Sequence, residues 1–193
     1  MHTRISATVV KAITLLTVGM CGLSLTACRT CEPASIEPLA ADMAEFFNMN
    51  DECPDGYALL TDARIMQQMG LSSNPDFIEN PSELSAMARY GGSKPILAVY
   101  GAEGEVCLLV NGIFFPERDG LKRFMESQAK KPNLRLAALE KPVADGTWLI
   151  LCAVDPRRHY SEQEQAAIRS SIKRHSEGIG ARILYSSLWA DHL

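Results

Sequence analysis

Apolar residues in the first half of the chain recur at helical spacing. One stripe follows Ser35, a good N-cap, and comprises Ile36, Leu39, Ala40, Met43, Phe46 and Phe47. Side chains three and four positions apart share one face of a helix, so this stripe predicts an amphipathic helix that packs on a core. Two shorter helices are predicted further on, one from Thr61 to Met69 and one from Ser82 to Tyr90, each followed by glycine.

The second half changes to short apolar runs bounded by turn residues, which is typical of β-strands. Asn111-Gly112, between two such runs, predicts a tight hairpin turn because both residues tolerate positive φ. Two helices interrupt the strands, one beginning at Asp119 and one running from the capping box of Ser161 and Glu164 to about His175. The predicted strands cover residues 95–100, 105–110, 113–115, 134–139, 147–154 and 181–189.

This order of elements predicts an α+β fold: a largely antiparallel sheet of five to six strands with helices packed on it, preceded by N-terminal helices. Residues 105–110 and 147–154 are apolar on both alternating faces, so we expect these strands to be central and covered on both sides. The order of strands and interleaved helices resembles that of profilin-like sensor domains and roadblock-type domains. This resemblance implies a sensing role.

The first 27 residues have the composition of an export signal. Arg4 and Lys11 form a basic start, an apolar run extends from Ala12 to Leu25, and small residues precede Cys28. The apolar run is shorter than the roughly 20 residues that span a bilayer. Leu25-Thr26-Ala27-Cys28 resembles the lipobox of bacterial lipoproteins. That resemblance implies diacylglycerol on the Cys28 sulfur, cleavage ahead of this residue, and acylation of the new N-terminus by a fatty acid such as palmitate.

Three segments follow from this interpretation: a signal peptide (1–27), a lipidated tether (28–35) and a single α+β periplasmic domain (36–193). Arg29 follows the lipidated cysteine, where lipoproteins retained in the inner membrane usually have Asp. The resemblance therefore implies a lipid anchor in the outer membrane, with the domain in the periplasm. In a source without an outer membrane, the anchor would lie in the cell membrane.

The charge of the chain argues against nucleic acid as a partner. The leader holds two basic residues and no acid, so its removal changes the formal net charge from −4 to −6. Such a negative field does not attract nucleic acid or anionic lipid. We therefore expect attachment to the membrane through the acyl chains, which hold firmly when two or three are present.

Lipidation of Cys28 leaves four thiols in the mature chain, namely Cys31, Cys53, Cys107 and Cys152. An even number suggests disulfides in an exported protein. Cys31 and Cys53 flank the first predicted helix and are expected to pair, which would contribute about 3 kcal/mol in the chain-entropy model. Cys107 and Cys152 lie inside apolar runs, where two interpretations stay open: a bridge between strands, or two buried free thiols.

Familiar catalytic motifs are absent from the sequence, including nucleophile elbows, zinc-binding helices, and phosphate and dinucleotide loops. The three histidines of the mature chain lack metal-ligand spacing, so we expect neither a metal nor another cofactor. The best candidates for contact with an anion or a partner are basic residues around the last helix: Arg157, Arg158, Lys173 and Arg174. A solvated basic helix explains the same residues.

Three hypotheses about function follow. The first is a non-catalytic envelope lipoprotein that binds an envelope protein or the cell wall. The second is a small-molecule sensing or carrier domain, which a cavity lined by residues of the central strands would support. The third is an enzyme, such as a hydrolase, whose site is assembled from distant acids such as Glu140, Asp145 and Asp155. The lack of a catalytic motif favours the non-enzymatic hypotheses.

Overall fold

The structure is a computed structural model that describes residues 45–69, 71, 76–77, 81–128, 135–156 and 158–189. The predicted signal peptide, the tether, Cys28, Cys31, Arg157 and most of the first predicted helix lie outside these residues. Among the described helices, none has the length and apolar character needed to cross a membrane.

The described helices are the 3-10 helix η1 (Glu45–Phe47), α3 (Ala63–Gln68), α4 (Pro81–Ala88), α5 (Arg118–Gln128) and α6 (Glu162–Gly178). The strands are β1 (Ala58–Leu59), β2 (Asp76–Phe77), β3 (Ser93–Ala102), β4 (Glu105–Phe115), β5 (Leu136–Val143), β6 (Gly146–Ala153) and β7 (Arg182–Ser186).

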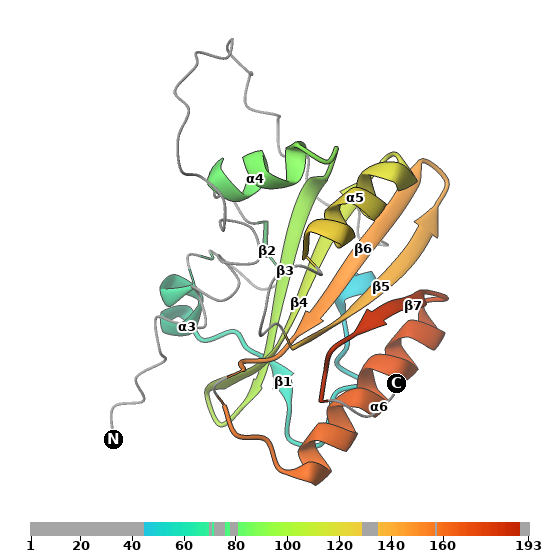
Figure 1. The fold of residues 1–193 in the computed structure, drawn as a ribbon. Coiled ribbons are helices and arrows are strands. Elements are labelled where there is room, and N and C mark those ends of the chain that lie inside the picture. Colours follow the sequence, from blue (N-terminus) through green and yellow to red (C-terminus); the bar gives the residue numbers. More distant parts are fainter. Residues whose placement is uncertain are drawn as a thin grey trace.

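All strands that pair with one another do so antiparallel, in the order β1-β3-β4-β6-β5-β7, and the short β2 also pairs with β3 (Figure 1). The predicted α+β class with a largely antiparallel sheet is therefore confirmed. The strands expected to be central, β4 and β6, lie side by side in the middle of the sheet, and both are buried along almost their whole length.

Helices cover both faces of the sheet, as Figure 1 shows for α5 and α6. On one face, Ile168 and Ile172 of α6 pack with Phe47 of η1 on inward-facing residues of β3 to β6. On the opposite face, α5 packs on β4 and β6 through Leu121 and Phe124, and α3 packs on β3 and β4. Alternating strand residues thus serve two cores, which explains the continuous apolar runs in the sequence.

The predicted hairpin at Asn111-Gly112 is wrong. Both residues lie inside β4, which is one continuous strand of 11 residues paired with β3 and β6. Gly112 does not form a turn; it allows the ring of Phe47 to pack closely against the strand, because a Cβ built at Gly112 would lie 2.0 Å from that ring. By contrast, the strands predicted over 95–100 and 105–110 do form a hairpin, as β3 and β4, with its turn at Glu103-Gly104, where Gly104 has a φ of +79°.

The structure shows which residues cap the N-termini of α3 and α6. The N-cap of α3 is Asp62 rather than Thr61, since its carboxylate accepts hydrogen bonds from the backbone N–H groups of Arg64 and Ile65. At α6 the capping interaction is as expected, with the Ser161 hydroxyl accepting from the Glu164 N–H at 3.2 Å.

Candidate functional site

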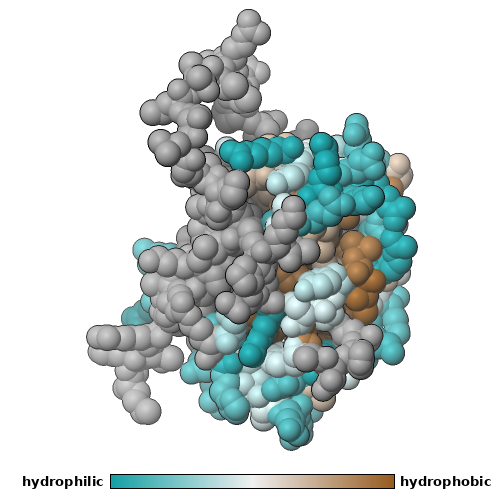
Figure 2. Space-filling model, in the orientation of Figure 1, coloured by the Kyte–Doolittle hydropathy of each residue, from teal (hydrophilic) through white to brown (hydrophobic). Residues whose placement is uncertain are grey.

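A groove of about 710 Å³ lies between α5 and the edge strand β7, with β5 and β6 forming its floor. Its base is apolar, and Figure 2 shows apolar surface gathered over β5 and β7 beside α5. A volume of several hundred Å³ with an apolar base and a few polar groups is typical of ligand sites. The residues lining it are Arg118, Asp119, Leu121, Lys122, Met125, Glu126, Gln128, Leu136, Glu140, Leu151, Leu184, Tyr185 and Ser187.

At one end of the groove the lining residues Arg118 and Glu140 form an ion pair, and Arg182, which is not part of the lining, also contacts Glu140. The Glu140 side chain is 5% exposed, and its oxygens accept hydrogen bonds from Arg118, at 3.0 and 3.4 Å, and from Arg182. The arginine side chains are 68% and 62% exposed. The three groups together carry a formal charge of +1, with the positive groups facing solvent.

The other end of the groove holds Gln128, the last residue of α5. This residue is 7% exposed, and its side-chain oxygen finds no hydrogen-bond partner among the described residues. Buried polar atoms of folded proteins are nearly always paired, and an unpaired one calls for an explanation. An acceptor left open at the wall of a groove is suited to a ligand donor.

An irregularity in β7 turns two large side chains in succession toward the groove. Tyr185 pairs with Ala138 and Ile183 pairs with Leu139, so Leu184 is an extra residue without a counterpart on β5. Leu184 and Tyr185 both line the groove, whereas Ile183 packs on the opposite core. Such bulges often re-aim side chains beside functional sites. Tyr185 is 45% exposed and is the only exposed large apolar side chain among the described residues.

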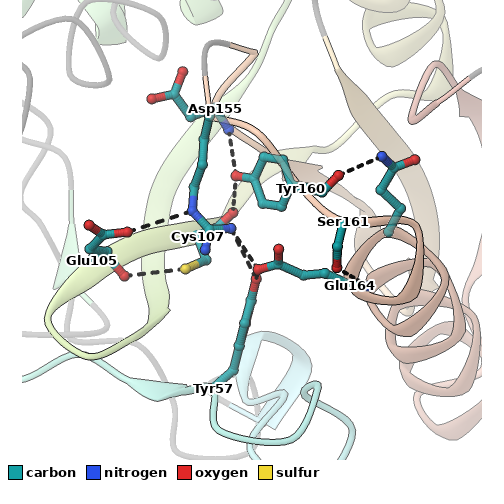
Figure 3. Close-up of polar contacts among 9 residues, drawn as sticks. Tyr57, Glu105, Cys107, Asp155, Tyr160, Ser161 and Glu164 are labelled. Atoms are coloured by element: carbon teal, nitrogen blue, oxygen red, sulfur yellow. Dashed lines mark hydrogen bonds and ion pairs between the residues drawn. The ribbon is translucent and has the colours of Figure 1, made fainter.

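The sequence-predicted Arg158 belongs to a separate polar cluster at the start of α6. Figure 3 shows other members of this cluster, Tyr57, Glu105, Tyr160 and Glu164. The Arg158 guanidinium donates to Glu164 at 2.6 Å, and the Tyr57 hydroxyl donates to the same carboxylate. It also lies 3.8 Å from Glu105 and stacks over the ring of Tyr160 at 4.4 Å. The single cation of this cluster, Arg158, is thus engaged by Glu164 and Glu105, and these contacts tie α6 to β4 and to the segment that holds Tyr57.

The electrostatics of this cluster follow from those contacts. Burial alone would raise the pKa of Glu164, but hydrogen bonds from Tyr57 and Arg158 outweigh it and lower the pKa below the usual 4.5. Burial and the bond to Glu164 raise the pKa of Tyr57 above its usual value. Burial also raises the pKa of Tyr160, to about 12, although Arg158 opposes the shift. At neutral pH the cluster therefore holds a carboxylate and two neutral phenols.

The predicted basic group does not form one site. Lys173 and Arg174 are exposed on α6, with Arg174 donating to the backbone oxygen of Glu52 at 2.8 Å. Lys173 lies 12 residues beyond the N-cap Ser161, which is about 18 Å along the helix. Arg158 faces Glu164 instead of solvent, and Arg157 lies outside the described residues, so their proposed contact with an anion or partner stays a prediction.

No disulfide joins the cysteines within the described residues, of which Cys107 and Cys152 are buried and Cys53 is half-buried. Val110 is the residue opposite Cys152, so Cys107 lies three residues, or about 10 Å, farther along β4. A disulfide needs Cα atoms within about 7 Å, so of the two interpretations left open the register supports free thiols. The pairing of Cys31 with Cys53 stays a prediction.

These thiols are poor nucleophiles. Burial, followed by the charge of Glu52, raises the pKa of Cys53 to about 12. Burial, with a smaller contribution from Cys53, also raises the pKa of Cys152 to about 12. Since the thiolate is the reactive form, neither residue is activated for chemistry at neutral pH.

The three acids considered for catalysis do not converge. Glu140 is held by its two arginines in the groove, whereas Asp145 and Asp155 lie beyond opposite ends of β6 and are roughly 30 Å apart. No group of three histidine, cysteine or acidic side chains in the described part of the chain has the arrangement of a metal site.

Comparison with known proteins adds no assignment: no protein family, no curated protein and no solved structure matches this chain. The resemblance in element order to sensor and roadblock-type domains therefore stays a prediction. The sequence does not predict the groove, although it offers Glu140 as a candidate catalytic acid. A signal was present at Ile183-Leu184-Tyr185, where three large residues in succession break the alternation of a strand.

Proposed function

We propose that this protein is a lipid-anchored binding module of the bacterial cell envelope whose ligand lies in the groove between α5 and β7. The observation that carries the binding role is the groove itself, which combines an apolar base with the open acceptor of Gln128. The lipobox resemblance of Leu25-Thr26-Ala27-Cys28 supports the anchor.

The chemistry of the groove favours binding over catalysis. Its most buried acid, Glu140, is engaged by two guanidinium groups and so is not poised to take a proton from a substrate. The apolar base offers Leu136, Leu151 and Leu184 to a ligand, and their contact would remove apolar surface from water. This arrangement fits the first sequence hypothesis, a partner-binding envelope lipoprotein. Leu151 of β6 is the one lining residue from the central strands β4 and β6, so the groove is not the central-strand cavity that would support the sensing or carrier hypothesis.

The anchor is tested by mass spectrometry of the protein purified from its native membranes. We expect a chain that begins at Cys28 and carries the mass of a diacylglyceryl group and an N-terminal acyl chain. A Cys28→Ser variant should lack both additions. A native chain with residues 1–27 still attached and an unmodified Cys28 would contradict the anchor.

The groove is tested by photo-cross-linking in intact cells. A benzoylphenylalanine in place of Tyr185 should form covalent adducts, because this side chain lies in the groove and is open to solvent. The matched control places the same group at Arg123, which is exposed on α5 and does not line the groove. Adducts that form equally at both positions, or at neither, would contradict the proposal.

A further inference from the structure

We infer that the groove binds the C-terminal segment of a partner protein, as an extended stretch of about four to five residues with apolar side chains and a free carboxylate. This inference rests on the proposed function and names the ligand class of the same groove. Three features carry it: the length of the groove, the chemistry of its two ends and the apolar base between them.

The length of the groove is set by α5, whose first residue, Arg118, and last residue, Gln128, both line it. Ten residues of helix rise about 15 Å. An extended peptide advances about 3.3 Å per residue, so four to five residues reach from one end to the other.

The Arg118 end suits a carboxylate. Arg118, the lining arginine at this end, is largely exposed and shares the charge of the buried Glu140 with Arg182, so the three groups together carry one excess positive charge. Guanidinium groups pair with carboxylates through strong, charge-assisted hydrogen bonds. The N-terminus of the 11-residue α5 lies at this end, and the positive end of its dipole adds to the attraction.

The Gln128 end suits a peptide N–H. The buried side-chain oxygen there needs a donor, and an extended peptide offers a backbone N–H at every residue except proline. A fatty acid would fill the apolar base and supply a carboxylate, but its hydrocarbon chain has no donor for Gln128. A peptide is therefore the ligand class that satisfies both ends of the groove.

The side of the groove formed by α5 adds a preference for the residues ahead of the C-terminus. Besides Arg118, this side carries Asp119, Lys122 and Glu126, which together give one excess negative charge. The excess negative charge is that of Asp119, beside Arg118, whereas Lys122 and Glu126 balance each other farther along α5. The bound segment is accordingly neutral away from its terminus, with apolar side chains toward Leu136, Leu151 and Leu184.

The test uses the full-length lipidated chain in phospholipid nanodiscs, with empty nanodiscs as reference. The probes are fluorescent five-residue peptides built from Ala, Val, Leu and Phe in all combinations, each made with a C-terminal carboxylate and again with a carboxamide. We expect a subset of the carboxylates to bind, and their carboxamide counterparts to bind about tenfold more weakly or worse, since a charge-assisted pair is lost.

Substitutions locate the bound peptide. Arg118→Gln should weaken binding about tenfold, whereas Arg123→Gln, also on α5 but outside the groove, should leave it unchanged. Gln128→Leu should weaken binding several-fold by removing the acceptor. Three results would overturn the inference: no peptide binds more strongly to the protein-containing nanodiscs than to empty ones, carboxamides bind as tightly as carboxylates, or Arg118→Gln leaves the affinity unchanged.

A parallel arm separates failure of this inference from failure of the proposed function. Decanoate, a soluble fatty acid, is tested against the same nanodiscs and variants. Binding of decanoate that depends on Arg118, without binding of any peptide, would overturn the peptide assignment and keep the groove as a ligand site. Absence of both, together with no position-specific cross-link at residue 185, would overturn the binding role itself.

Discussion

At Gln128 the groove keeps a side-chain oxygen that is buried without a partner among the described residues. Leaving a buried polar atom unpaired costs about 1–3 kcal/mol of folding free energy. Leucine has a similar size and no polar atom, so it would be the more stable choice for the free protein. We interpret the amide as a group whose hydrogen bond is completed by the ligand.

Replacing Gln128 by Leu should therefore raise the free energy of unfolding by about 1 kcal/mol, as measured by urea denaturation of the unliganded protein. The matched control is Gln165→Leu, because the Gln165 amide donates to the Tyr160 backbone oxygen at 2.8 Å. That substitution should lower stability by about 1 kcal/mol. A loss of stability in Gln128→Leu as large as in the control would contradict the interpretation.

Because Gly112 has no side chain, the ring of Phe47 can pack directly against the backbone of β4. The ring of Phe47 occupies the space of a Cβ at Gly112, so Gly112→Ala should destabilise the protein by about 1–3 kcal/mol through overpacking. Phe47→Leu in the same chain should recover part of that loss, as a double-mutant cycle in urea would show. Gly178→Ala is the control, since its nearest neighbour is Glu52 Oε1 at 3.7 Å. Additive effects of the Gly112 and Phe47 substitutions would contradict this account.

At the scale of elements, α6 is held at its start by the cluster of Tyr57, Arg158 and Glu164. The folded protein lowers the pKa of Glu164, so its ionised form favours folding. This contribution is complete at neutral pH, above the usual glutamate pKa of 4.5. It is lost as the pH falls below that value and through the folded-state pKa.

Glu164→Gln should therefore make stability less sensitive to acid, because the glutamine has no proton to gain. Urea unfolding at a series of pH values between 7 and 3 measures this, and the gap between wild type and variant should narrow as the pH falls. Glu162→Gln, which changes an exposed acid on the same helical turn, should retain the acid-dependent loss due to Glu164. A constant gap across the series would contradict the assigned role of Glu164.

Elements with a local cause were predictable from sequence. The start of α6 was predicted because Ser161 and Glu164 interact within one turn, and the central strands because β4 and β6 are apolar on both faces. The Asn111-Gly112 hairpin was mispredicted because its glycine is required by Phe47, a residue far away in the sequence. Periodicity along a chain contains no information about such long-range contacts.

At the scale of the whole molecule, the groove exists because the two faces of the sheet are covered unevenly. On its face α5 packs on β4 and β6, which leaves β5 and β7 beside it open, whereas α6 fills the opposite face. The site could not be predicted from sequence, because Glu140 meets Arg118 and Arg182 only after β5 and β7 pair. Fold class follows from local patterns, but this site depends on how distant segments assemble.

The central claim, that a ligand occupies this groove, is tested most directly by hydroxyl-radical footprinting of the full-length chain in intact cells and after purification. Tyr185 and Met125 line the groove, whereas Tyr90 packs elsewhere against Phe124. The account predicts that oxidation of Tyr185 and Met125 is slower in cells than in the purified protein, with Tyr90 unchanged. Equal oxidation of Tyr185 and Met125 under both conditions would contradict it.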